Sequence, residues 1–149
     1  MRDTAHVDSE ISWAAAAAIT LPVTVVLIAS GLLVRELAVR GADGRLKRNR
    51  IAGLRSPATL ASDEAWLAGH IAGLTDTVRG GTVAIASAVV ALGASWLLGL
   101  VDVLDPEGVV VTWTTIILIG VVAMSILLVR GFVHGNRAAK ATAAVEATG

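Results

Sequence analysis

Residues 11–34 read ISWAAAAAITLPVTVVLIASGLLV, a run that contains no ionisable side chain. As an α-helix rising about 1.5 Å per residue, such a run can cross a hydrocarbon core of about 30 Å. A bilayer offers the backbone no water to bond, so we expect this segment to be helical, with a kink at Pro22. A cleaved signal peptide is disfavoured because residues 1–10 are more acidic than basic and the apolar run is long.

Two further runs, residues 82–101 and 109–129, also lack ionisable side chains. Hydrophobic residues make up 55% of the 149-residue chain, and charged residues 16%, against about 25% in soluble domains. A soluble bundle of three such helices would have too little polar surface to cover them. The sequence therefore predicts an all-α integral membrane protein with three transmembrane helices and a cytoplasmic loop that carries a short amphipathic helix.

The distribution of charge predicts the orientation of the spans. Basic side chains concentrate between the first two spans and after the third, whereas the link DVLDPEG at residues 102–108 is acidic. By the positive-inside rule we expect a multi-pass protein with its N-terminus outside and its long loop and C-terminus in the cytoplasm. Trp13, Trp96 and Trp113 fall near the predicted outer ends, where an aromatic belt is expected.

The predicted segments are these: an extracellular N-terminus at 1–10, spans at 11–34, 82–101 and 109–129, a cytoplasmic motif loop at 35–81, an extracellular link at 102–108 and a cytoplasmic tail at 130–149. The end of that tail, AAKATAAVEATG, is predicted to be solvated and disordered.

The second span is rich in small residues, among them Ala84, Ala88, Gly93 and Gly99. Small residues let helices approach closely in lipid, which would make this span the centre of the bundle or of a dimer. A general compositional bias toward Ala and Gly is the alternative. No span carries a charge at membrane depth, which disfavours a proton-coupled transporter but leaves a passive pore open.

The predicted loop has its own pattern. A basic run from Arg45 to Arg50 suits anionic headgroups, and it lacks the interleaved aromatic residues of a nucleic-acid site. Ser62 is a predicted N-cap, and Asp63 and Glu64 favour the first turn of a helix. That helix places Trp66 and His70 on one face and is predicted to end at Gly80-Gly81, with Trp66 anchored at the headgroups.

The loop carries a composite motif. Asn49, Gly53, Arg55, Pro57, Thr59, Ser62, Glu64, Trp66 and His70, with the residues between them, form the stretch NRIAGLRSPATLASDEAWLAGH at 49–70. This stretch resembles the signature of the SdpI/YfhL family of bacterial membrane proteins, in which two apolar spans follow the motif. The resemblance implies a role in immunity to a secreted toxic peptide, or in signalling by holding a transcriptional repressor at the membrane.

The motif residues favour organisation over catalysis. Glu64 and His70 are six residues apart and do not share a helical face, which argues against a metal or acid–base pair. We therefore predict no catalytic residue, no metal, no cofactor and no enzymatic activity. Arg55 is predicted to donate a forked pair of hydrogen bonds to Glu64 or Asp63, Asn49 to cap a turn, and His70 to contact residues 49–57.

Two functions are compatible with the sequence. One is a binding or signalling module of the SdpI type, in which the nine motif residues bind a toxic peptide or a cytoplasmic regulatory protein, or only hold the helices together. The other is a small transport or pore-forming membrane subunit, assembled from several copies of the chain. The bilayer is the expected partner in both, and the zero net charge gives no reason to expect direct binding of nucleic acid.

Overall fold

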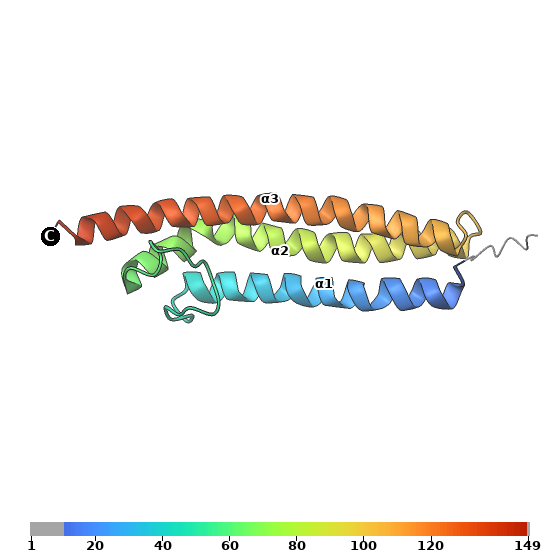
Figure 1. The fold of residues 1–149 in the computed structure, drawn as a ribbon, viewed down its shortest axis with the longest axis horizontal. Coiled ribbons are helices and arrows are strands. Elements are labelled where there is room, and N and C mark those ends of the chain that lie inside the picture. The colour runs from blue at the N-terminus through green and yellow to red at the C-terminus, as the bar shows by residue number, and fades with distance from the viewer. Residues whose placement is uncertain (1–10, 149) are drawn as a thin grey trace, which may run out of the picture.

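The computed structural model describes residues 11–148, and within them the secondary structure is entirely helical (Figure 1). Helix α1 spans Trp13–Ala42, α2 spans Asp63–Leu100 and α3 spans Pro106–Glu146. Each is long and apolar enough to cross a membrane, with mean hydropathies of 2.3, 2.1 and 2.6 over its most apolar window. The three predicted transmembrane helices are thereby confirmed. The predicted extracellular segment 1–10 lies outside the described residues.

Each helix begins at a polar side chain that binds a free backbone N–H. Ser12 accepts from Ala15 N at 3.2 Å, Ser62 from Ala65 N at 3.0 Å, and Asp105 from Gly108 N at 2.7 Å. Such N-caps satisfy donors that the first turn cannot pair internally. The N-cap predicted at Ser62 is confirmed, and Asp63 and Glu64 occupy the first turn of α2.

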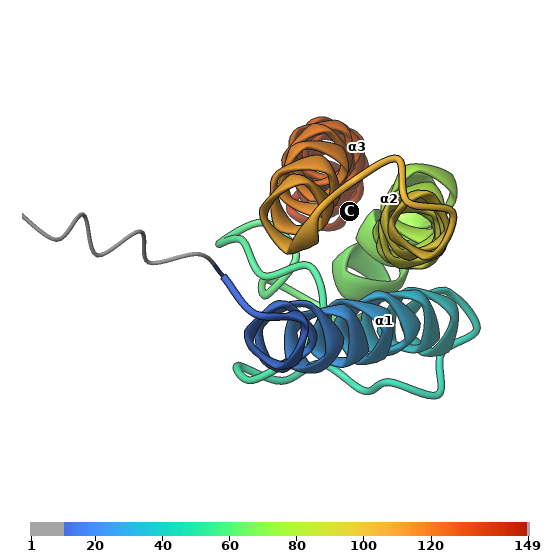
Figure 2. The same cartoon turned by 90° about the vertical axis from the view of Figure 1, so that its right-hand side faces the viewer.

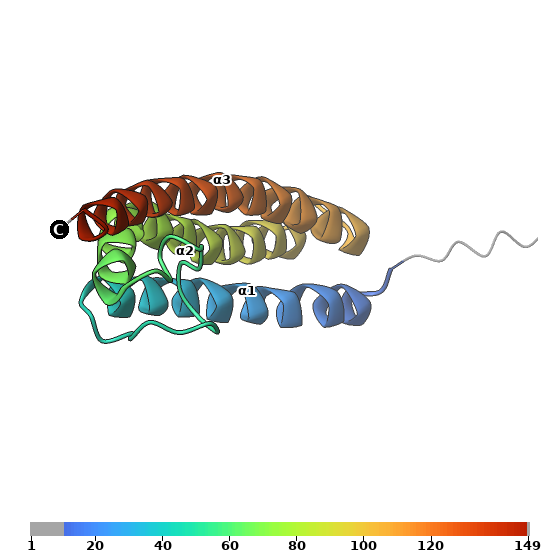
Figure 3. The ribbon, with the colours of Figure 1, turned by 60° about the vertical axis from the view of Figure 1, so that its left-hand side comes forward.

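Helix α2 is the central element of the bundle. The helices run antiparallel in chain order, and α2 packs against both α1 and α3, which barely touch each other. Viewed from one end, α1 lies to one side of the α2–α3 pair (Figure 2). The long connection from α1 to α2 and the C-terminus lie at the same end of the bundle (Figure 3).

Glycine lets the backbones approach closely. A Cβ atom added at Gly81 of α2 would lie 2.7 Å from the carbonyl oxygen of Gly31 on α1. One added at Gly73 would lie 2.7 Å from the carbonyl oxygen of Gly131 on α3. Real Cβ atoms do not come this close, so a side chain at either position would separate the helices. Helix α2 is the centre of the bundle, as predicted, but these two close contacts lie before the span in which small residues were singled out; within that span Ala84, Ala88 and Gly99 are buried.

Tryptophans join the helices at the end opposite the long connection. Trp96 Nε1 donates to Thr20 Oγ1 at 3.2 Å, and Trp113 Nε1 donates to Thr24 Oγ1 at 3.1 Å. Trp13 and Trp96 also contact each other, with ring centroids 5.9 Å apart. The three rings therefore gather at one end, but Trp113 is buried within the bundle and does not belong to an exposed belt.

The predicted break at Gly80-Gly81 is wrong. Helix α2 continues through both glycines, so the expected separate amphipathic helix is the first part of α2. A glycine inside a helix costs only about 1 kcal/mol relative to alanine. Here Gly80 lies under Leu128 of α3 and Gly81 against Gly31 of α1, so the continuous helix contacts both of its neighbours at these glycines.

The prediction of a disordered tail is also wrong. Helix α3 extends to Glu146, well past the last apolar span residue. Its extension packs on the start of α2: Ala139 is fully buried, and a Cβ atom at Gly135 would lie 2.6 Å from the carbonyl oxygen of Gly69. Alanine-rich composition suits a helix whose neighbour approaches this closely.

Candidate functional site

The candidate site is the segment that joins α1 to α2, residues 43–62, which we call the motif loop, together with the first turns of α2. At its start Arg45 Nε donates to Asp43 Oδ2 at 2.8 Å, and this hydrogen bond lowers the pKa of Asp43 from its ordinary value. Two glycines, Gly44 and Gly53, have positive φ values of 75° and 93° and allow the chain to reverse.

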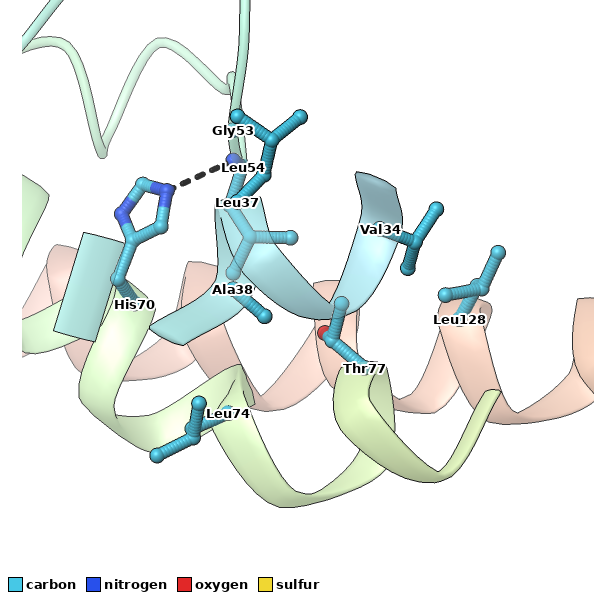
Figure 4. Close-up of a pocket in the computed structure, with 9 residues that line it drawn as sticks. All are labelled: Val34, Leu37, Ala38, Gly53, Leu54, His70, Leu74, Thr77 and Leu128. Carbon is cyan, nitrogen blue, oxygen red and sulfur yellow. Dashed lines mark hydrogen bonds between the residues drawn. The ribbon is translucent and has the colours of Figure 1, made fainter. Parts of the chain in front are cut away.

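His70 holds the motif loop against the helices. Its Nε2 accepts the backbone N–H of Leu54 at 2.9 Å, the bond drawn in Figure 4. Its Nδ1 lies 2.8 Å from the carbonyl oxygen of Trp66. Because a backbone N–H can only donate and a carbonyl can only accept, the imidazole is neutral with its proton on Nδ1. The predicted contact of His70 with residues 49–57 is confirmed.

Glycines enclose the imidazole ring. A Cβ atom at Gly53 would lie 2.5 Å from His70 Nε2, and one at Gly41 would overlap the ring carbon Cδ2. Gly53 in addition needs the left-handed conformation, which side chains rarely adopt. Two separate constraints therefore require glycine at position 53: the positive φ of its backbone and the lack of space beside His70.

Trp66 packs against the His70 ring. The two ring centroids are 4.3 Å apart, and Trp66 Nε1 donates to the carbonyl oxygen of Leu46 at 2.8 Å. The indole is buried, with only 3% of the residue exposed. The prediction that Trp66 anchors the helix at the headgroups is therefore wrong: the side chain is enclosed by the loop that precedes it.

Residues 56–59 form a turn closed by side chains. The hydroxyl of Thr59 accepts the N–H of Ser56 at 2.8 Å and donates to the carbonyl oxygen of Leu54 at 2.8 Å, and Ser56 Oγ accepts the N–H of Thr59 at 3.1 Å. Ser56 and Thr59 are both buried, and Pro57 lies exposed between them. Thr59 packs against Gly69 of α2 through its methyl group.

Leu54 inserts into the seam between α2 and α3. A Cβ atom at Gly73 or at Gly135 would lie 2.7 Å or 2.8 Å from Leu54 Cδ1. The loop therefore touches α3 as well as α2, and it does so at glycines that the sequence alone did not single out.

Asn49 caps a turn, as predicted. Its Oδ1 accepts the N–H groups of Ile51 and Ala52, both at 2.8 Å, and its Nδ2 donates to the carbonyl oxygen of Lys47 at 2.8 Å. These bonds fix the backbone on both sides of Arg50 and leave the side chains of Arg50 and Ile51 exposed.

The predicted partner of Arg55 is wrong. Arg55 Nη1 donates to the carbonyl oxygen of Arg50 at 2.8 Å, within the loop. It is Arg48 that binds the start of α2, with Nε 2.8 Å from Asp63 Oδ1 and Nη1 2.8 Å from the carbonyl oxygen of Leu60. Glu64 is exposed in the first turn. The basic run of the loop thus supplies the ion pair that the motif arginine was expected to make.

A second polar cluster was missed in the sequence. Asp76 of α2 is buried, with its Oδ2 3.1 Å from His134 Nδ1 and 3.8 Å from Arg130 Nε, both on α3. The only signal in the sequence is a lone carboxylate in the apolar stretch that precedes Arg79. Its two partners lie far away in the chain, so the cluster depends on how α2 and α3 pair.

The polar side chains of the site bind other parts of the protein and are not free to act on a ligand. Both nitrogens of His70 are engaged by backbone groups, and Asp63 is paired with Arg48. Within residues 11–148 no group of three His, Cys, Asp or Glu residues could hold a metal ion. What the site presents outward is a set of exposed side chains on a fixed backbone, which we call the motif face: Lys47, Arg50, Ile51 and Arg55.

A family model described as the SdpI/YfhL protein family matches residues 45–130. The match covers the motif loop from Arg45 onward, all of α2 and α3 as far as Arg130. No curated protein and no solved structure matches the chain.

Proposed function

The chain belongs to the SdpI/YfhL protein family, and from this premise we propose that it is a binding module of the membrane. In this proposal the motif face recruits a cytoplasmic regulatory protein, and the protein as a whole protects the cell against a secreted toxic peptide. Its place is the bacterial inner membrane, with the motif loop in the cytoplasm as the basic residues predict.

The observation that carries the proposal is an ordered loop with an exposed apolar residue at its tip. Ile51 is 87% exposed, the highest value among the large hydrophobic residues described, and it lies beside Arg50 on a backbone fixed by Asn49. Ordering each loop residue costs about 1–2 kcal/mol of conformational entropy. An exposed aliphatic side chain flanked by cations is suited to a partner with an apolar and acidic surface.

The test uses Ile51→Asp and Arg50→Glu, which change the motif face without removing any side-chain hydrogen bond described above. Cells that lack the gene receive either variant or the native gene and are challenged with secreted peptides from related bacteria, while cross-linking through position 47 identifies bound proteins. We expect both variants to lose protection and cross-linking at unchanged membrane abundance. Full protection by both variants would contradict the proposal.

Transport by a pore-forming assembly is the weaker candidate. The small residues of the second span suggested this function, but Ala84, Ala88 and Gly99 are buried within the chain itself, whereas Gly93 faces open space. Solute flux through vesicles that contain the purified protein tests this alternative directly. Catalysis is not part of the proposal, because both nitrogens of the buried motif histidine are bound to backbone groups.

A further inference from the structure

A cavity of about 180 Å³ lies beneath the motif loop (Figure 4). Helix α1 lines it with Val34, Leu37 and Ala38, and α2 with His70, Leu74 and Thr77. Leu128 of α3 and residues 53–54 of the loop complete the lining. The cavity is not enclosed.

The chemistry of the lining selects an apolar ligand. Its two polar side chains are already engaged: His70 binds Leu54 N and Trp66 O, and Thr77 Oγ1 donates to the carbonyl oxygen of Gly73 at 2.8 Å. A polar ligand would lose its hydrogen bonds to water and regain few here. The volume is near that of an engineered cavity of about 150 Å³ that binds benzene, so a short length of hydrocarbon fits.

The position of the cavity points to lipid as the source of that hydrocarbon. Val34 and Leu128 belong to the charge-free spans, and the cavity is not enclosed, so hydrocarbon beside these spans can reach it. Exposed apolar residues continue past it on all three helices, at Val39, Ile71 and Phe132. Arg35, exposed at this level, can extend its charged end toward the headgroups. This position favours an acyl chain over a soluble apolar ligand.

We propose that this cavity binds an acyl chain of a membrane phospholipid, which enters between α1 and α3 and contacts His70 beneath the motif loop. The acyl chain fills the space under Gly53 and Leu54, the two residues of the motif loop that line the cavity together with His70. The bound lipid thereby becomes part of the support for the motif loop, a role that does not depend on the binding partner proposed above.

Trp66 reports on the cavity because it contacts His70, which lines it. The protein retains Trp66 alone, with Trp13, Trp96 and Trp113 replaced by Phe, and is placed in vesicles of phosphatidylcholine with or without brominated acyl chains. Bromine quenches tryptophan fluorescence at short range. We expect brominated lipid to quench Trp66 at least twofold, although the side chain is buried.

Matched variants locate the quencher. Ala38→Phe fills the cavity, whereas Val39→Phe adds the same ring to the exposed side of α1. We expect the first to abolish quenching and to remove co-purified phospholipid in native mass spectrometry, and the second to do neither. Leu74→Phe fills the cavity from α2 and gives the same result if Ala38→Phe fails to fold.

Two outcomes would overturn the proposal. One is quenching that persists at full strength in both cavity-filling variants, which would place the bromine elsewhere. The other is an unquenched Trp66 whose emission responds only to an added leucine-rich peptide, which would assign the cavity to a protein partner.

Discussion

The two connections of this protein perform the same geometric task by very different means. Helices α2 and α3 are joined by residues 101–105, in which Asp102 has a φ of 57° and Val103 N donates to Leu98 O at 2.9 Å. Helices α1 and α2 are joined by the motif loop, residues 43–62. Antiparallel helices need a link of only about 2–8 residues. The length and the side-chain bonding of the motif loop therefore exceed what joining two helices requires.

The short link is held by backbone bonds and one cap, whereas the motif loop depends on side chains from distant positions. His70 and Trp66 of α2 bind backbone atoms of Leu54 and Leu46, and Leu54 reaches glycines on two helices. A short link can therefore be specified by its own residues, whereas an ordered long loop depends on the helices against which it packs. Substitutions in the two connections should therefore have different effects.

Gly53→Ala should have the largest effect. Its backbone has a φ of 93°, and the new Cβ would lie 2.5 Å from His70 Nε2, so we expect a loss of about 3 kcal/mol in the stability of the docked loop. Hydrogen exchange of the loop amides measures this loss. Gly44→Ala is the matched control, because its φ is 75° but nothing lies within 4 Å of the added atom. Equal losses in the two variants would show that contact with His70 is unimportant.

His70→Phe should have the next largest effect. Phenylalanine keeps the ring against Trp66 but leaves the N–H of Leu54 without its acceptor, at a cost of about 2 kcal/mol. We expect the amide of Leu54 to lose protection from exchange, while the amide of Val103 in the short link keeps it. Loss of protection at both amides would mean that the two connections are not independent.

Thr59→Val should have an intermediate effect. The substitution keeps the shape but removes the oxygen that serves Ser56 N and Leu54 O, and we expect about 1.5 kcal/mol of destabilisation of the loop. Thr114→Val provides the comparison, since that exposed hydroxyl bonds only within its own helix, to the carbonyl oxygen of Val110. Thermal unfolding in detergent should distinguish the two. Similar unfolding temperatures would contradict the role assigned to Thr59.

Asp105→Ala should have the smallest effect, and only at the short link. It removes the cap of α3, worth about 1 kcal/mol, because Gly108 N loses its acceptor. We expect faster exchange in the first turn of α3 with no change in the motif loop or in protection of the cell. Faster exchange in the motif loop as well would show that the two connections are not independent.

Much of the candidate site could be predicted from the sequence where the interaction is local. Asn49 and its turn, and Ser62 and its helix, bond within three residues, so the spacing in the sequence carries the information. The partner of Arg55 could not be predicted, because several arginines compete for Asp63 and only the path of the loop selects Arg48. The burial of Trp66 and the Asp76 cluster escaped prediction for the same reason: both depend on segments distant in the chain.

The sequence by itself determined the three helices, because apolar runs of this length have only one way to satisfy their backbones in lipid. It also determined where the helices start, through polar caps that act over three residues. Three features depend on the tertiary structure: α2 continues through Gly80-Gly81, the last turns of α3 are helical, and His70 supports the motif loop. Those outcomes follow from contacts between segments that are distant in the chain, and no local sequence pattern contains the energies of such contacts.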